Sequence, residues 1–121
     1  MSTPLATVDI TDLTTHGAVL HFTFTDELGR PHRAFLLRHG DTLRAFENRC
    51  PHWSTPLDEH GDHLYDRASD TLVCATHGAR FLPDDGHCVS GPCTGDSLTP
   101  LAVHPTDDPT RVRITRQGLR L

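Results

Sequence analysis

The chain has 121 residues, a formal net charge of −5, 36% apolar residues and 22% charged residues. This length and composition are typical of one globular domain, and they argue against general disorder. The acidic balance argues against nucleic acid as the main partner, because a phosphate-binding surface needs an excess of positive charge.

The N-terminal stretch MSTPLATVDI has neither the positive region nor the apolar region of a secretory signal. The longest apolar runs, such as AFLL at 34–37, are far too short to cross a bilayer. We therefore expect a cytoplasmic protein with no membrane partner. In that reducing compartment, cysteines serve more often as thiols or metal ligands than in structural disulfides.

Strand patterns follow one another in the first half of the chain. In residues 18–25 the apolar Leu20, Phe22 and Phe24 alternate with polar residues, which is the period of two of a half-buried strand. Two further strands are predicted at 32–38 and 42–48, after turn-forming residues. Together they predict a β-meander whose third strand leads directly into Cys50.

The second half also favours strands, after a polar stretch. Residues 53–70 are rich in Asp and turn formers, and they predict a loop with at most one helical turn. No segment shows the pattern of an amphipathic helix, so the predicted fold class is all-β. Strands are expected at 71–75, 79–83, 87–90, 98–105 and 111–121.

Two short motifs carry potential metal ligands. Cys50 and His52 form a C-x-H pair, and Cys74 and His77 form a C-x-x-H pair. Each pair lies in a turn after a predicted strand. Two thiolates and two imidazoles in two loops indicate a metal site.

The one-residue interval between Cys50 and His52 bears on which metal is bound. Zinc accepts two Cys and two His, usually through longer intervals that let both ligands reach one ion. In a two-iron cluster each loop can give one ligand to each metal, and Pro51 helps to aim the two side chains at different atoms. We favour the cluster; zinc in the same ligands, and chance pairing, are the alternatives.

The segments CPHWSTPL, CATHGARF and DDGHCVSGPC closely resemble the cluster-binding motifs of Rieske [2Fe–2S] proteins, in particular the small soluble Rieske-type ferredoxins. The resemblance is strong over about residues 45–103. It implies a single domain over 1–121, with antiparallel sheets in a Rieske-like fold and a small cluster-binding subdomain at about 47–99. It also implies one [2Fe–2S] cluster per chain, with Cys50 and Cys74 on the buried iron and His52 and His77 on the outer iron.

The same resemblance assigns roles to residues around the ligands. Leu57 is expected to pack against the partner loop, and Gly91 and Pro92 to form a third loop that shields the cluster. In respiratory members of the family, a Ser and a Tyr donate hydrogen bonds at the positions that Ala79 and Phe81 occupy here. The side chains of Ala79 and Phe81 cannot donate a hydrogen bond. We therefore expect a reduction potential at the low end of the Rieske range, on the order of −150 to −50 mV.

The remaining cysteines and histidines carry less information. Cys88 and Cys93 are interpreted as structural thiols, with a disulfide as the alternative, and neither is expected to be a ligand. Phe81 is predicted to be a core residue beside the cluster. The eight other histidines, including His60, His63 and His87, are predicted to be solvated.

The resemblance implies an electron-transfer protein that has no substrate of its own. It would accept single electrons from a flavin-containing reductase and pass them to a terminal oxygenase, most simply a ring-hydroxylating one. The alternative is a small redox subunit of a larger enzyme, such as an assimilatory nitrite reductase.

Overall fold

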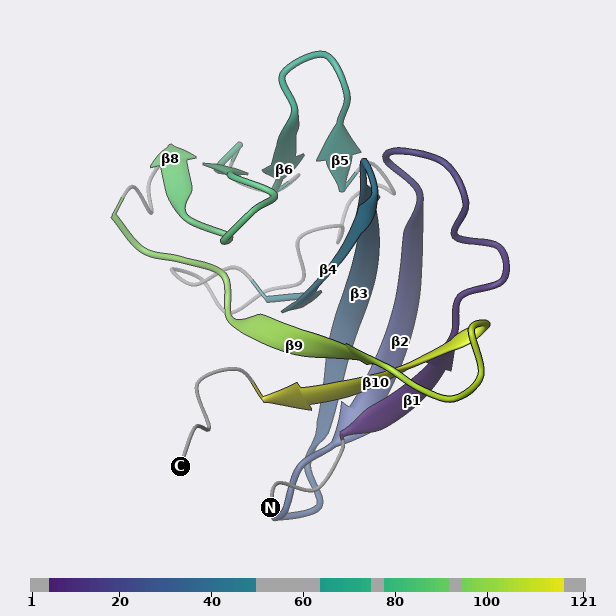
Figure 1. Cartoon of the computed structure of the whole chain (residues 1–121). Helices are drawn as coiled ribbons and strands as arrows, with labels where there is room; N and C mark the ends of the chain where they lie inside the picture. Colours follow the sequence, from purple (N-terminus) through teal and green to yellow (C-terminus); the bar gives the residue numbers. More distant parts are fainter. Residues whose placement is uncertain (1–4, 50–63, 75–77, 92–94, 117–121) are drawn as a thin grey trace.

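The computed structural model describes residues 5–49, 64–74, 78–91 and 95–116, which carry ten strands in two antiparallel sheets (Figure 1). Within these ranges there is no helix long and apolar enough to cross a membrane. The larger sheet has the order β1-β10-β9-β4-β3-β2. Its strands are β1 Ala6–Asp9, β2 Val19–Thr25, β3 Pro31–His39, β4 Thr42–Glu47, β9 Pro100–Pro105 and β10 Arg111–Arg116.

The smaller sheet has the order β5-β6-β7-β8 and lies beyond one end of the long strands β2 and β3 (Figure 1). It is built from very short strands joined by turns, which suits a segment that holds loops in place. Its strands are β5 Tyr65–Asp66, β6 Thr71–Val73, β7 Arg80–Phe81 and β8 Cys88–Ser90.

The predicted all-β class and the meander are confirmed. β2, β3 and β4 pair in succession, with Leu20 opposite Leu36 and Leu36 opposite Ala45. In β2, Phe24 is buried, and Leu20 and Phe22 pack against the same core, while the alternate residues His21, Thr23 and Thr25 are exposed. The alternation of apolar and polar residues predicted this strand because its apolar face packs against the core and its polar face is exposed to solvent.

Two strands were not predicted. β1 pairs with β10 from Ala6 opposite Ile114 to Asp9 opposite Arg111, although no sequence pattern predicted a strand there. β5 lies inside the stretch 53–70, so the prediction of a loop is wrong for Tyr65–Asp66. Both segments are too short to show a period of two, and they become strands only by pairing with a partner.

β3 separates the two hydrophobic cores. Its residues Phe35 and Leu37 belong to the core shared with the smaller sheet, whereas Ala34 and Leu36 belong to the core enclosed by the larger sheet. All four side chains are buried. Successive side chains of a strand point to opposite faces, so the unbroken run AFLL is the sequence of a strand covered on both sides.

Candidate metal centre

Cys74 directly follows β6, and it is the one predicted ligand that lies among the described residues. Its side chain has 0% exposure and lies in the core shared by the two sheets, with Leu72 and Phe81. Its own N–H donates to the carbonyl oxygen of Ala79 at 2.8 Å, and its carbonyl oxygen accepts from the N–H of Gly78, also at 2.8 Å. These two bonds close the base of the loop that carries His77.

Gly78 makes that closure possible. Its φ of +71° lies in the left-handed region, where a side chain is strained. The backbone conformation therefore explains the glycine of the CATHG motif, whether or not a metal is bound.

The other predicted ligands Cys50, His52 and His77 lie outside the described residues. The chain that leads to Cys50 is nevertheless fixed, because the N–H of Asn48 donates to Arg33 O at 2.8 Å and that of Glu47 to Thr99 O at 3.0 Å. β4 thus ends in the larger sheet and β6 in the smaller one, and each strand delivers one of the two motifs. Whether all four ligands converge stays a prediction.

The segment after β8 comes very close to the loop after Cys74. A Cβ built on Gly91 would lie 2.7 Å from the Cα of Ala79 and 3.2 Å from its Cβ. Gly91 also has a φ of +99°. Only glycine fits both constraints, so the third loop is in backbone contact with the second one at Gly91. Pro92 lies outside the described residues.

Ala79 and Phe81 both have 0% exposure, so the prediction that Phe81 is a core residue is confirmed. Cys88 pairs with Phe81 across β7 and β8, is equally buried, and its Sγ donates to the carbonyl oxygen of Ser90 at 3.3 Å. The predictions for Leu57, His60, His63 and Cys93 concern residues outside the described ranges.

The prediction that the remaining histidines are solvated is wrong for His32. Its side chain is 21% exposed and stacks on the ring of Phe24 at 4.8 Å. Its Nε2 lies 2.8 Å from Asp26 Oδ2, and its Nδ1 lies 2.9 Å from Glu47 Oε1. The bond to Asp26 and the bond and charge of Glu47 raise the pKa of His32, while the bond from His32 lowers the pKa of Asp26 to about 2.

His39 is the second exception, because its side chain is also only 21% exposed. Its Nε2 donates to Asp70 Oδ1 at 2.8 Å, and the hydroxyl of Tyr65 donates to the same oxygen at 2.5 Å. Burial, followed by the bond to Asp70, raises the pKa of Tyr65 to about 12, so this phenol stays protonated. His87 is exposed, as predicted.

The two antiparallel sheets place the chain among the small all-β domains, and Cys74 provides a buried thiol at a loop base where a metal could be bound. The particular family follows from comparison with known proteins: the model of the Rieske [2Fe–2S] domain matches residues 8–106. The chain belongs to the Rieske [2Fe–2S] domain family.

Individual relatives agree with this assignment. The oxygenase component of chloroacetanilide N-alkylformylase from Rhizorhabdus wittichii (strain DC-6 / KACC 16600) is 43% identical over 72 residues, 59% of this chain. The aligned part covers 19% of that relative, so the chain corresponds to about a fifth of its length.

Two solved structures share the fold. The ferredoxin of carbazole 1,9a-dioxygenase from Nocardioides aromaticivorans IC177 has a TM-score of 0.68 and 24% identity, with 96% of this chain and 100% of that chain covered. A chain in the complex of reduced oxygenase and oxidized ferredoxin in carbazole 1,9a-dioxygenase has a TM-score of 0.66 and 21% identity, with 99% and 96% covered.

The described residues fit the cofactor of the family. A [2Fe–2S] cluster needs thiolates shielded from water, and Cys74 lies in the core at the base of a tightly closed loop. The contact of Gly91 with Ala79 places a third segment against that loop without a side chain between them. Two cysteines and two histidines in the two motifs are the donor set that the Rieske type of cluster uses.

Proposed function

We propose that Cys50, His52, Cys74 and His77 bind one [2Fe–2S] cluster in this chain, and that the chain carries single electrons to a terminal oxygenase. The observation that carries the ligand proposal is the position of Cys74, a fully buried thiol at the base of a loop that also holds a histidine three residues later. When bound, the cluster supplies reversible one-electron chemistry.

The protein contributes an asymmetric environment for that chemistry. Cys74 lies in the apolar core between the sheets. This environment favours a thiolate that is bound in a group of low net charge over a thiolate that carries its charge alone. We expect the two histidines to face outward, as the resemblance to the family implies for the ligands of the outer iron. Electrons would then pass through the imidazole edges.

The carrier role is supported by the extent of the structural likeness. This chain aligns with the whole of a ferredoxin, whereas it aligns with only a fifth of an oxygenase component. A domain that holds one redox group and matches a ferredoxin over its full length suits an electron carrier that docks and leaves. We further propose that the donor is a flavin-containing reductase and that the chain works in the cytoplasm as a single domain.

The expected potential follows from the residues around the loop. Ala79 and Phe81 are buried and have no side-chain donor, so they cannot stabilise the reduced cluster by hydrogen bonds. We therefore propose a midpoint on the order of −150 to −50 mV, at the low end of the Rieske range. A midpoint above about +100 mV would contradict this explanation.

The ligand proposal is tested with two matched cysteine variants. Cys74 and Cys88 both have 0% exposure and both lie in the smaller sheet or directly after one of its strands. Cys74→Ser should abolish the visible absorption and the EPR signal of the reduced cluster, whereas Cys88→Ser should keep both. Retention of a full cluster in Cys74→Ser, or its loss only in Cys88→Ser, would show that the ligands are wrong.

Histidine ligation needs a separate measurement. Clusters held by four thiolates have potentials of about −400 mV, well below the Rieske range. Replacing His52 or His77 by Cys should therefore lower the midpoint or destroy the cluster. An unchanged potential in both variants would contradict the proposed histidine ligands.

The carrier role is tested by reconstitution. Neighbouring genes for an oxygenase and a flavin reductase would supply the two partners, and hydroxylation should then depend on this chain and stop with Cys74→Ser. Neighbouring genes for a sirohaem enzyme, with copurification of its large subunit, would instead support the alternative of a fixed redox subunit.

A further inference from the structure

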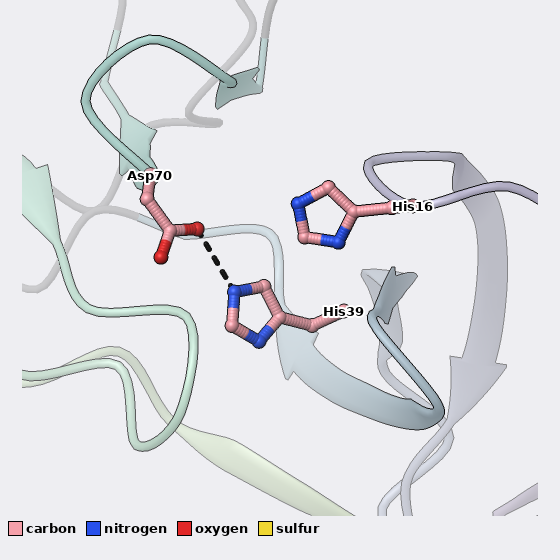
Figure 2. Close-up of side chains that lie close together, drawn as sticks. All are labelled: His16, His39 and Asp70. Atoms are coloured by element: carbon pink, nitrogen blue, oxygen red, sulfur yellow. Dashed lines mark hydrogen bonds and ion pairs between the residues drawn. The ribbon is translucent and has the colours of Figure 1, made fainter.

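Three chemically active side chains meet at a place that the proposed cluster does not use. His16 lies in the connection between β1 and β2, His39 ends β3, and Asp70 ends the turn between β5 and β6. One ligand atom of each lies within 4.8 Å of those of the other two. Figure 2 shows the two imidazoles and the carboxylate facing a common space at the junction of the two sheets.

The groups around this space already converge on one oxygen. His39 Nε2 and the hydroxyl of Tyr65 both donate to Asp70 Oδ1, at 2.8 and 2.5 Å. His16 Nε2 lies 2.9 Å from the Tyr65 oxygen. Two protons thus point toward the Asp70 carboxylate and a third toward the Tyr65 oxygen beside it, an arrangement that a bound cation could replace.

This cluster is separate from the predicted iron ligands. Asp70 and Cys74 lie at opposite ends of β6, Thr71–Val73. Four residues of extended chain span about 13 Å. A ligand bound at His16, His39 and Asp70 would therefore not share a side chain with the [2Fe–2S] cluster.

We propose that His16, His39 and Asp70 form a second metal site, which binds a divalent ion of the zinc or copper class. Two imidazoles and one carboxylate are a common ligand set for these ions, and a water molecule would be the fourth ligand. The ion would join the connection β1–β2, the end of β3 and the turn β5–β6. It would thereby cross-link the larger sheet to the smaller one.

The proton positions decide how the ion would enter. For His39, coordination through Nε2 moves the ring proton to Nδ1, which faces Asp84 Oδ1 at 3.7 Å. A carboxylate in that place is the usual outer partner of a ligating histidine, and it favours the required tautomer.

His16 has to give up two hydrogen bonds. In the present arrangement its Nδ1 accepts from the N–H of Gly40 at 2.9 Å, so its proton is on Nε2, which donates to the Tyr65 oxygen at 2.9 Å. Coordination through Nε2 moves the proton to Nδ1 and breaks both bonds. His16 is exposed and lies in a loop, so its ring can turn away from Gly40 and move toward the ion.

The distances set the size of that movement. Bonds of about 2.0–2.1 Å in a tetrahedral site place the ligand atoms about 3.3 Å apart. The pair His39 and Asp70 is already within that spacing at 2.8 Å, and no pair of the three is wider than 4.8 Å. His16 must therefore close by at most roughly 1.5 Å. We expect modest affinity and a preference for ions that bind imidazole strongly, in the order copper above zinc.

The site is tested on the cluster-loaded protein with zinc ions. The protein is dialysed against about 100 µM free Zn²⁺, and zinc and iron are then measured in the same sample. Wild type should hold one zinc more per chain than His39→Asn or Asp70→Asn. His87→Asn, which replaces an exposed histidine directly before β8, is the matched control and should bind as much zinc as wild type.

Two further readouts separate this site from the iron cluster. Zinc should raise the thermal midpoint of wild type and of His87→Asn by several degrees, but not that of the site variants. The iron content and the visible spectrum should be the same in all four proteins, so a failure of the zinc site leaves the proposed function intact. Equal zinc uptake by wild type and both site variants, or no uptake by wild type, would overturn the proposal.

Discussion

The contact between Gly91 and Ala79 gives a sharp test of how the third loop is held. Gly91→Ala adds one Cβ, which would lie 2.7 Å from the Cα of Ala79. Real Cβ atoms do not approach a backbone carbon so closely, so one of the two segments must move. The substitution also places a side chain at a φ of +99°.

Gly95 separates these two effects. Its φ is +100°, but a Cβ built there meets nothing within 4 Å. Gly95→Ala therefore carries the strain of the left-handed backbone without the clash, and the difference between the two variants isolates the packing of the third loop. Overpacking of this kind costs about 1–3 kcal/mol.

Thermal unfolding followed by circular dichroism, at one scan rate, gives the readout. For a chain of this length, 1 kcal/mol corresponds to about 4 °C, so Gly91→Ala should unfold about 4–12 °C below Gly95→Ala. The visible absorption of the cluster should also decay faster in Gly91→Ala. Equal midpoints in the two variants would refute the reasoning, because the close approach would then carry no energy.

Three further substitutions test other parts of the structure. His32→Asn should destabilise the protein most between pH 3.8 and 6.5. The pKa of His32 is raised in the folded protein, so the stabilisation from the protonated imidazole is complete below pH 6.5 and is lost as the pH rises through the folded pKa. The pKa of Asp26 is lowered, so the stabilisation from its carboxylate is lost as the pH falls from 3.8 toward the folded pKa of about 2. If the denaturant midpoints of wild type and His32→Asn differed by the same amount at every pH, this ion-pair network would be excluded. Leu36→Ala should cost about 2–5 kcal/mol in denaturant unfolding, because Leu36 has 0% exposure, whereas Leu28→Ala, at a residue with 75% exposure, should stay within about 0.5 kcal/mol. Similar values for both would show that the core enclosed by the larger sheet is not tightly packed. Ala79→Ser should raise the midpoint potential in voltammetry by supplying a hydroxyl donor, with Ala102→Ser on β9 as the control, and an unchanged or lower value would argue against Ala79 lying beside the cluster.

Local patterns in the sequence were sufficient for much of the fold. The alternation in 18–25 predicted β2 because one face of that strand is buried and the other is exposed. The spacing within the two Cys and His motifs was also enough to suggest a metal centre. Neither prediction requires knowledge of distant parts of the chain.

The structure decided what depends on partners far away in the sequence. β1 and β5 are strands because they pair with β10 and β6, and their own residues are too few to show a pattern. β3 is buried on both faces because the two hydrophobic cores lie on opposite sides of it.

The histidines show the same division most clearly. His16 and His39 each precede a glycine, and in the sequence they look like ordinary polar turn residues. Only the packing of the turn β5–β6 against the end of β3 brings Asp70 to within 2.8 Å of His39. Residue type and short spacing are written in the sequence, whereas the meeting of residues 31 positions apart is set by how the two sheets pack.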